Sequence, residues 1–184
     1  AVHKGKRDCV DAFVIACYGD PGLYAAREIT DAPVIGIAEA SMHMATMVAS
    51  KFSIIAVIPR TILMLEELLV KYGMKDKCVS IRSSGMQVLE VENDPETGLK
   101  RIREESYKAV AEDGAEAICL GCAGMTKFAE ELEKELGVPV FDGVATAVKL
   151  CEAMVGLGKK TSKRLYFSYP EKKRYIGFPE IFQP

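Results

Sequence analysis

No hydrophobic run in this chain of 184 residues approaches the roughly 20 residues that a membrane-spanning helix requires. The first residues, AVHKGKRDCVD, contain no apolar segment of the kind found in a secretory signal. Charge of one sign is not in excess either, since 24 basic and 26 acidic residues leave a net charge of -2. A chain of this kind has no general attraction for nucleic acid. We therefore expect neither a membrane nor a nucleic acid as partner.

Histidine is scarce, and the loops that bind nucleotides are missing. The chain has only His3 and His43, whereas a zinc site needs three or four nitrogen, sulfur or oxygen ligands. His43 follows Glu39 by one helical turn, a spacing that can bind a metal, but the methionine-rich stretch SMHMATM around it indicates a packed helix. No G-x-G-x-x-G or Walker sequence occurs. The sequence therefore predicts no metal and no nucleotide cofactor.

The six cysteines do not form the dense pattern of a small secreted scaffold. Cys78, Cys119 and Cys151 lie inside apolar runs, where a thiol usually serves as a small hydrophobic side chain. We interpret Cys9, near the start of the chain, as an exposed thiol without a role. This usage is typical of a reduced, cytoplasmic protein, and a composition of 49% hydrophobic and 27% charged residues is typical of a globular one.

Short apolar runs alternate with helical patterns along the chain. The runs are continuous rather than alternating in polarity, which indicates parallel strands covered on both faces. The helical patterns end in Gly73 and Gly137, and Thr126 has the side chain of a helix N-cap. The alternation predicts an α/β fold with parallel sheets. We expect strands at 12–17, 33–37, 52–58, 78–81, 117–121 and 139–142, and helices at 60–73, 97–114 and 126–137.

Two segments, 12–37 and 116–144, repeat one plan of strand, cysteine, glycine-containing turn, helix and Pro-Val strand. Cys17 precedes Pro33 by 16 positions and Cys122 precedes Pro139 by 17. The repeat predicts two similar lobes, each a short parallel sheet flanked by helices, with the active site in the cleft between them. We expect residues 1–38 plus 144–184 to form the first lobe and residues 39–143 the second.

Cys17 and Cys122 each stand where a predicted strand gives way to a glycine turn and a helix. Ligands of open parallel sheets bind at this end of the strands. Backbone N–H groups and a helix dipole favour an anion there, so we expect the thiol pKa to fall from about 8.5 toward neutrality. Glycines at 19, 22, 121 and 124 allow the backbone to approach closely.

Two thiols on opposite sides of one cleft can take a proton from a carbon acid and return one to its other face. This is racemisation or epimerisation by a two-base mechanism, which needs no metal and no cofactor. Nearby N–H groups would stabilise the enolate oxygen that develops. We expect Asp20 to cap the first helix, with Pro21 in its first turn, rather than to act as a base.

The stretches ACYGDPGL, PVIGIAEA, LGCAGM, GVPVFDGV and GLGKKTSKR together resemble the aspartate/glutamate/hydantoin racemase superfamily, and most of all its hydantoin and allantoin racemase branch. The resemblance implies that Cys17 and Cys122 are the catalytic acid/base pair. In the amino-acid racemases a polar pair follows each cysteine, whereas here the followers are Tyr18-Gly19 and Ala123-Gly124. These four residues are expected to bind a neutral or ring-like substrate through backbone amides.

The resemblance therefore implies a cofactor-independent racemase of 5-substituted hydantoins or allantoin, acting on a small molecule. Family members begin with a strand ending in Pro-Asn, which we expect to be absent from these residues. Ile58-Pro59 stands where relatives often carry a hydroxyl residue, which implies an altered pocket. Relatives commonly assemble, so a homo-oligomer is left open.

Three other interpretations remain open. The first is a racemase or isomerase of an acyclic acid such as aspartate or maleate. The second is a non-catalytic small-molecule binding protein of the same fold. The third is a redox protein that uses the C-x-x-C of Cys119 and Cys122, which is disfavoured because Cys119 lies inside a predicted strand rather than at a helix start.

Overall fold

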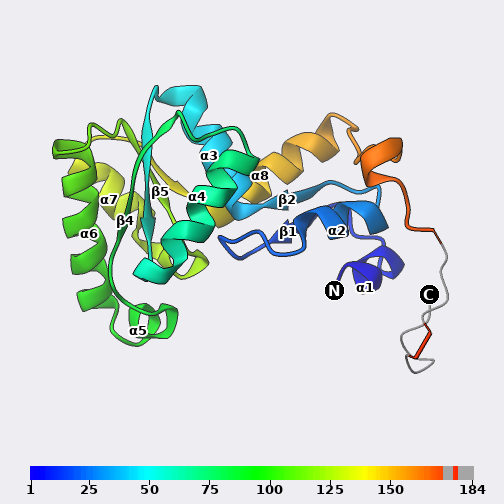
Figure 1. The fold of residues 1–184 in the computed structure, drawn as a ribbon, viewed down its shortest axis with the longest axis horizontal. Coiled ribbons are helices and arrows are strands. Elements are labelled where there is room, and N and C mark those ends of the chain that lie inside the picture. Colours follow the sequence, from blue (N-terminus) through cyan, green and yellow to red (C-terminus); the bar gives the residue numbers. More distant parts are fainter. Residues whose placement is uncertain (172–175, 178–184) are drawn as a thin grey trace.

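The structure of the protein, a computed structural model, describes residues 1–171 and 176–177 and contains two parallel sheets with helices around them (Figure 1). The smaller sheet pairs β1 (Phe13–Ile15) with β2 (Val34–Gly36). The larger sheet has the order β4-β3-β5-β6, and every pair in it is parallel. Its strands are β3 (Phe52–Ala56), β4 (Cys78–Ser83), β5 (Ala117–Leu120) and β6 (Val140–Asp142).

All six predicted strands are present, and the α/β class with parallel sheets is confirmed. The predicted strand ends differ from the observed ones by no more than two residues. The ends agree because most strands are largely apolar and buried. In β3, for example, all five residues are buried. The sheets match the two halves of the sequence repeat, with Cys17 following β1 and Cys122 following β5. The lobe boundaries remain a prediction, and part of 144–184 lies outside the described residues.

Helices and 3-10 turns follow the strands along the chain. Two of the helices, α3 and α8, pack against each other between the two sheets (Figure 1). Among the described residues, no helix combines the length and the apolar character needed to cross a bilayer. The helices are α1 (Val2–Arg7), α2 (Leu23–Ile29), α3 (Ile37–Val48), α4 (Ile62–Lys71), α5 (Val88–Asn93), α6 (Pro95–Ala111), α7 (Ala129–Leu136) and α8 (Gly143–Gly156), with 3-10 turns η1 (Pro59–Thr61), η2 (Ala123–Phe128) and η3 (Leu165–Phe167).

The predicted helices are present, but one predicted cap is wrong. Gly137 ends α7 with a φ of 68°, the left-handed conformation that favours glycine at this position. Thr126, by contrast, lies inside η2 and does not cap α7. Its hydroxyl is instead 2.8 Å from the Ala123 carbonyl and 2.8 Å from Asp142 Oδ1. A tertiary contact with the residue that precedes α8 has therefore replaced the local cap.

Candidate active site

The two predicted thiols lie in matching turns just beyond the carboxyl ends of β1 and β5. The backbone N–H of Asp20 donates to the Cys17 carbonyl at 2.9 Å, and that of Met125 donates to the Cys122 carbonyl at 3.1 Å. Each cysteine therefore opens a turn that its own carbonyl closes three residues later. Cys17 is exposed and Cys122 is partly buried.

One cavity of about 310 Å³ is lined by both turns. It brings together all six residues that the sequence singled out, although the two cysteines are far apart in the chain. The wall is mostly apolar, and none of its side chains carries a formal charge apart from a thiol that ionises. The lining residues are Ala16, Cys17, Tyr18, Gly19, Val57, Thr61, Met64, Leu65, Val88, Gly121, Cys122, Ala123 and Gly124.

The wall facing the two turns comes from residues that the sequence did not single out. Met64 on α4 lies close to Gly19, since a Cβ built there would be 3.0 Å from its sulfur. Val88, at the start of α5, lies beside Gly124. Thr61 brings a hydroxyl group into the wall and donates to the Ile58 carbonyl at 2.8 Å. Apolar residues on a helix carry no local signal that marks them as cavity residues, so only the fold could identify them.

The sequence predicted a lowered pKa for the thiols, and for Cys122 this is wrong. Burial raises the pKa of the Cys122 thiol, and a negative charge on Cys17 would raise it further. The backbone N–H of Gly124, which donates to the Cys122 sulfur at 3.4 Å, acts in the opposite direction. The apolar wall outweighs this single N–H group. Cys122 therefore holds its proton at neutral pH.

The side chain of Tyr18 points away from the cavity into the core. It is 4% exposed, and its hydroxyl is 2.8 Å from Ser41 Oγ on α3. Burial, followed by the charge of Cys119, raises the pKa of this phenol. Tyr18 therefore offers the cavity its main chain, and its role in substrate recognition stays a prediction.

Asp20 is a cap, but of a different helix from the one predicted. Its carboxylate accepts hydrogen bonds from the backbone N–H groups of Ala38 and Glu39, in the first turn of α3. The helix after Asp20, α2, follows Gly22 as its N-cap residue and has no side-chain cap. The expected local cap is replaced by one that joins the Cys17 turn to a helix behind it.

The remaining thiols, Glu39 and His43 do not line this cavity. Cys119 is fully buried in β5, and all six cysteines are free. The carboxylate of Glu39 binds Arg27 at 2.5 Å, and His43 Nδ1 is 2.7 Å from the Glu39 carbonyl. Over the part of the chain that the structure describes, no three His, Cys, Asp or Glu side chains cluster as metal ligands do.

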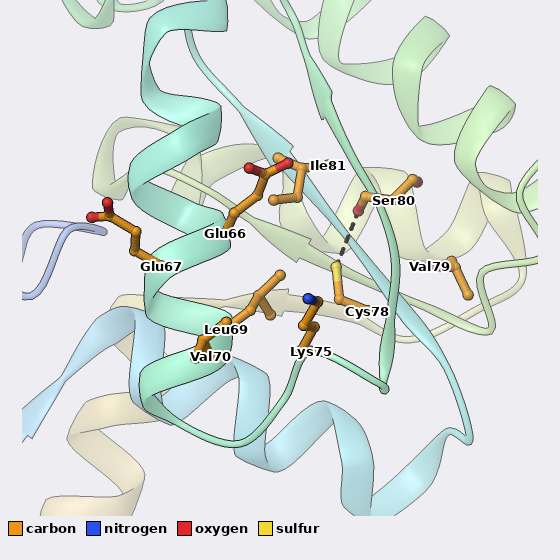
Figure 2. Close-up of a pocket in the computed structure, with 9 residues that line it drawn as sticks. All are labelled: Glu66, Glu67, Leu69, Val70, Lys75, Cys78, Val79, Ser80 and Ile81. Atoms are coloured by element: carbon orange, nitrogen blue, oxygen red, sulfur yellow. Dashed lines mark hydrogen bonds between the residues drawn. The ribbon is translucent and has the colours of Figure 1, made fainter.

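A larger hollow of about 490 Å³ lies between α4 and β4 (Figure 2). Its thiol, Cys78, is within 3.2 Å of the Ser80 carbonyl, and burial raises the pKa of this thiol to about 12. Neither Cys17 nor Cys122 lines this hollow. In Figure 2 the carboxylates of Glu66 and Glu67 leave α4 in different directions. The smaller cavity, with its two thiols, is therefore the candidate active site.

Comparison with known proteins gives consistent matches. Residues 1–151 match the family described as Asp/Glu/Hydantoin racemase. The chain is 57% identical over 181 residues to a hydantoin racemase of Pseudomonas sp. (strain NS671), covering 98% of this chain and 73% of the relative.

Solved structures agree in both fold and sequence. Allantoin racemase from Klebsiella pneumoniae superposes with a TM-score of 0.93 and 46% identity over 96% of this chain and 72% of its own. Allantoin racemase from Pseudomonas fluorescens gives a TM-score of 0.87 and 39% identity over 91% of this chain and 71% of its own.

Proposed function

Because the chain belongs to the Asp/Glu/hydantoin racemase family, we propose that it racemises 5-substituted hydantoins or allantoin with Cys17 and Cys122 as its two acid/base groups. Family and relatives identify the chain as a racemase, which is an isomerase. The observation that carries the two-cysteine mechanism is the shared cavity, in which two thiols follow the ends of two parallel strands.

The reaction moves one proton off the ring carbon and another onto its opposite face. A thiolate on one side takes the proton, and the electron pair of the C–H bond passes into the adjacent carbonyl to form an enolate. The thiol on the other side then protonates the same carbon, and the enolate electrons return to form the new C–H bond. Backbone N–H groups after each cysteine, at residues 18–19 and 123, stabilise the enolate oxygen.

The electrostatics of the cavity oppose two thiolates at the same time. A negative charge on Cys17 raises the pKa of Cys122, so the two groups resist ionising together. When one of the two is ionised, the pair holds the one base and the one acid that transfer across a plane requires. After each turnover the roles are exchanged, and the opposite enantiomer is then the substrate.

The wall of the cavity favours a neutral ring over an acyclic acid. Among its described lining residues no side chain is cationic, so a substrate carboxylate would meet no charged partner. An aspartate or maleate isomerase is therefore the second candidate. A substrate panel containing aspartate, maleate, allantoin and a 5-alkyl hydantoin separates the two. Independence of cofactors is part of the proposal and is checked by activity after dialysis against a chelator.

The decisive experiment compares Cys17→Ala with Cys122→Ala in deuterated water, starting from each pure enantiomer. We expect both variants to lose racemisation by more than about 10³-fold, since neither retains a group to complete the transfer. The thiol that remains still removes and returns the proton on its own face. Slow deuterium exchange without inversion is therefore expected, for one enantiomer in Cys17→Ala and for the opposite enantiomer in Cys122→Ala.

The matched control is Cys78→Ala, whose thiol lies outside the cavity. This variant should racemise at the wild-type rate. Racemisation that persists in either Cys17→Ala or Cys122→Ala would refute the two-cysteine mechanism. Loss in the control variant as well would indicate a general loss of folding, which thermal unfolding of all three variants detects.

A further inference from the structure

The turn that carries Cys17 is fastened to helix α3 by the two residues on either side of Gly19. Tyr18 reaches Ser41 through its hydroxyl at 2.8 Å, and Asp20 reaches the first turn of α3. Both side chains are almost fully buried. Cys17, Tyr18 and Gly19 line the cavity, whereas Asp20 does not. The turn is therefore open to the cavity on one side and held to α3 on the other.

Asp20 makes two hydrogen bonds to α3, whereas Tyr18 makes one. Its Oδ1 accepts from the Ala38 N–H at 3.2 Å and its Oδ2 from the Glu39 N–H at 2.9 Å. Gly36, at the start of α3, has no side chain, and a Cβ there would lie 2.3 Å from Asp20 Cγ. Asp20 itself has a φ of 44°, uncommon for a residue with a side chain. The glycine and the strained backbone both accommodate this one carboxylate.

A third donor ties Asp20 to the helix that forms the far wall of the cavity. The Tyr72 hydroxyl, at the end of α4, donates to Asp20 Oδ2 at 2.8 Å. The same helix carries Met64, which lies against Gly19 across the cavity. Burial raises the pKa of the Asp20 carboxyl, and the three hydrogen bonds counter that rise. One carboxylate therefore joins the Cys17 turn, α3 and α4.

The Cys122 turn is attached in a similar way to the start of helix α8. Thr126, in the η2 turn after Cys122, has its hydroxyl 2.8 Å from Asp142 Oδ1. Asp142 caps α8 by accepting from the N–H groups of Val144 and Ala145 at 2.9 and 3.0 Å. Since α3 and α8 pack against each other, the two turns are anchored to one pair of helices.

We propose that Asp20, with Tyr72, is a positioning residue that holds Cys17 in place for proton transfer, and that Thr126 with Asp142 does the same for Cys122. This inference rests on the proposed two-cysteine mechanism. Neither Asp20, Tyr72, Thr126 nor Asp142 lines the cavity, so each acts through its cysteine. Their effect is large because a displacement of about 1 Å at a reacting group can cost about 10²-fold in rate.

The test uses Asp20→Asn, Tyr72→Phe and Thr126→Val. The asparagine keeps the shape of Asp20 but has only one acceptor oxygen for three donors. We expect kcat to fall at least about tenfold in Asp20→Asn and less in Tyr72→Phe, with KM changed by less than about twofold, because substrate contacts remain.

The distinguishing measurement is the ratio of deuterium exchange without inversion to inversion, taken separately for each enantiomer. For the enantiomer that Cys122 deprotonates, inversion needs a proton from Cys17, so a misplaced Cys17 should raise this ratio. For the opposite enantiomer the ratio should fall. Thr126→Val should produce the reverse pattern. A variant that only loosens the fold would move both enantiomers alike.

The matched control is Ser53→Ala, which removes a buried hydroxyl bonded to Ser80 at 2.7 Å, away from the cavity. The inference is supported if the ratio of exchange to inversion shifts in opposite directions for the two enantiomers and does not shift in Ser53→Ala. Wild-type kinetics in Asp20→Asn and Tyr72→Phe, or ratios of exchange to inversion that move in the same direction for both enantiomers, overturn it. If Asp20→Asn does not fold, the ratios measured for Tyr72→Phe and Thr126→Val test the inference instead. If Cys17→Ala still racemises, the proposed function fails instead, whatever the Asp20 variants do.

Discussion

Gly143 meets the backbone of Ile37 where the first turns of α8 and α3 come together. A Cβ built on Gly143 would lie 2.7 Å from the Ile37 carbonyl oxygen and 3.0 Å from its Cβ. Only a residue without a side chain allows this approach. The contact joins the two helices at the ends that Asp20 and Thr126, from the two cysteine turns, bind.

Gly143→Ala should destabilise the protein. The added methyl group meets backbone, which cannot move aside as a side chain can, so we expect a loss of about 1–3 kcal/mol in the free energy of unfolding. Urea denaturation measures it. The control is Gly156→Ala at the other end of the same helix, where nothing lies within 4 Å of the new atom. That variant should be unchanged or more stable by up to about 1 kcal/mol. Equal effects at the two positions would contradict the close contact.

Gly121→Ala should affect both stability and activity. Its Cβ would lie 2.7 Å from the Ile55 carbonyl, to which the Gly121 N–H donates at 2.9 Å. Relief of this overlap displaces the start of the Cys122 turn, so we expect kcat to fall by about tenfold or more together with a lower melting temperature. Gly124→Ala is the comparison, because its new atom makes only ordinary contacts at 3.7 and 3.8 Å. It should leave the melting temperature unchanged and raise KM, since Gly124 lines the cavity.

Cys122 should react slowly with iodoacetamide at neutral pH. Because burial raises the pKa of its thiol, the rate of alkylation should continue to increase with pH beyond about 8.5, where an ordinary thiol begins to level off. Mass spectrometry of the peptide containing Cys122 follows the rate, and Cys122→Ser removes the signal. A rate that reaches its plateau below pH 8 would show that the thiol pKa is lowered instead.

The contribution of Asp113 to stability should be lost at acid pH. Its hydrogen bonds with Arg82, at 2.6 and 2.8 Å, lower the pKa of this carboxyl to about 2 in the folded chain, below the value of about 3.9 in unfolded chains. A lowered folded pKa means that the stabilisation is complete above about pH 4 and is lost as pH falls from there toward 2. Unfolding free energies of the wild type and Asp113→Asn should therefore converge over this range. A constant difference between them down to pH 2 would contradict the assignment.

Most strands were readable from the sequence because they are largely apolar runs, as β3 shows with all five residues buried. The repeat also placed Cys17 and Cys122 correctly at equivalent strand ends, since that position depends on local chain direction. The cap roles of Asp20 and Thr126 were not predicted correctly. Both side chains have local partners available by propensity, yet both bind at the first turn of a helix that comes from elsewhere in the chain.

The chain order of apolar runs, glycines and cysteines was enough to specify an α/β protein with two related halves and to select two thiols. Which surfaces meet is a different kind of information, because it depends on packing between segments far apart in the chain. That packing puts Met64 and Val88 opposite the cysteine turns and buries Cys122 in an apolar wall. Burial then outweighs the helix-end effect that local reasoning expects, so the acidity of this thiol was decided by its neighbours in space.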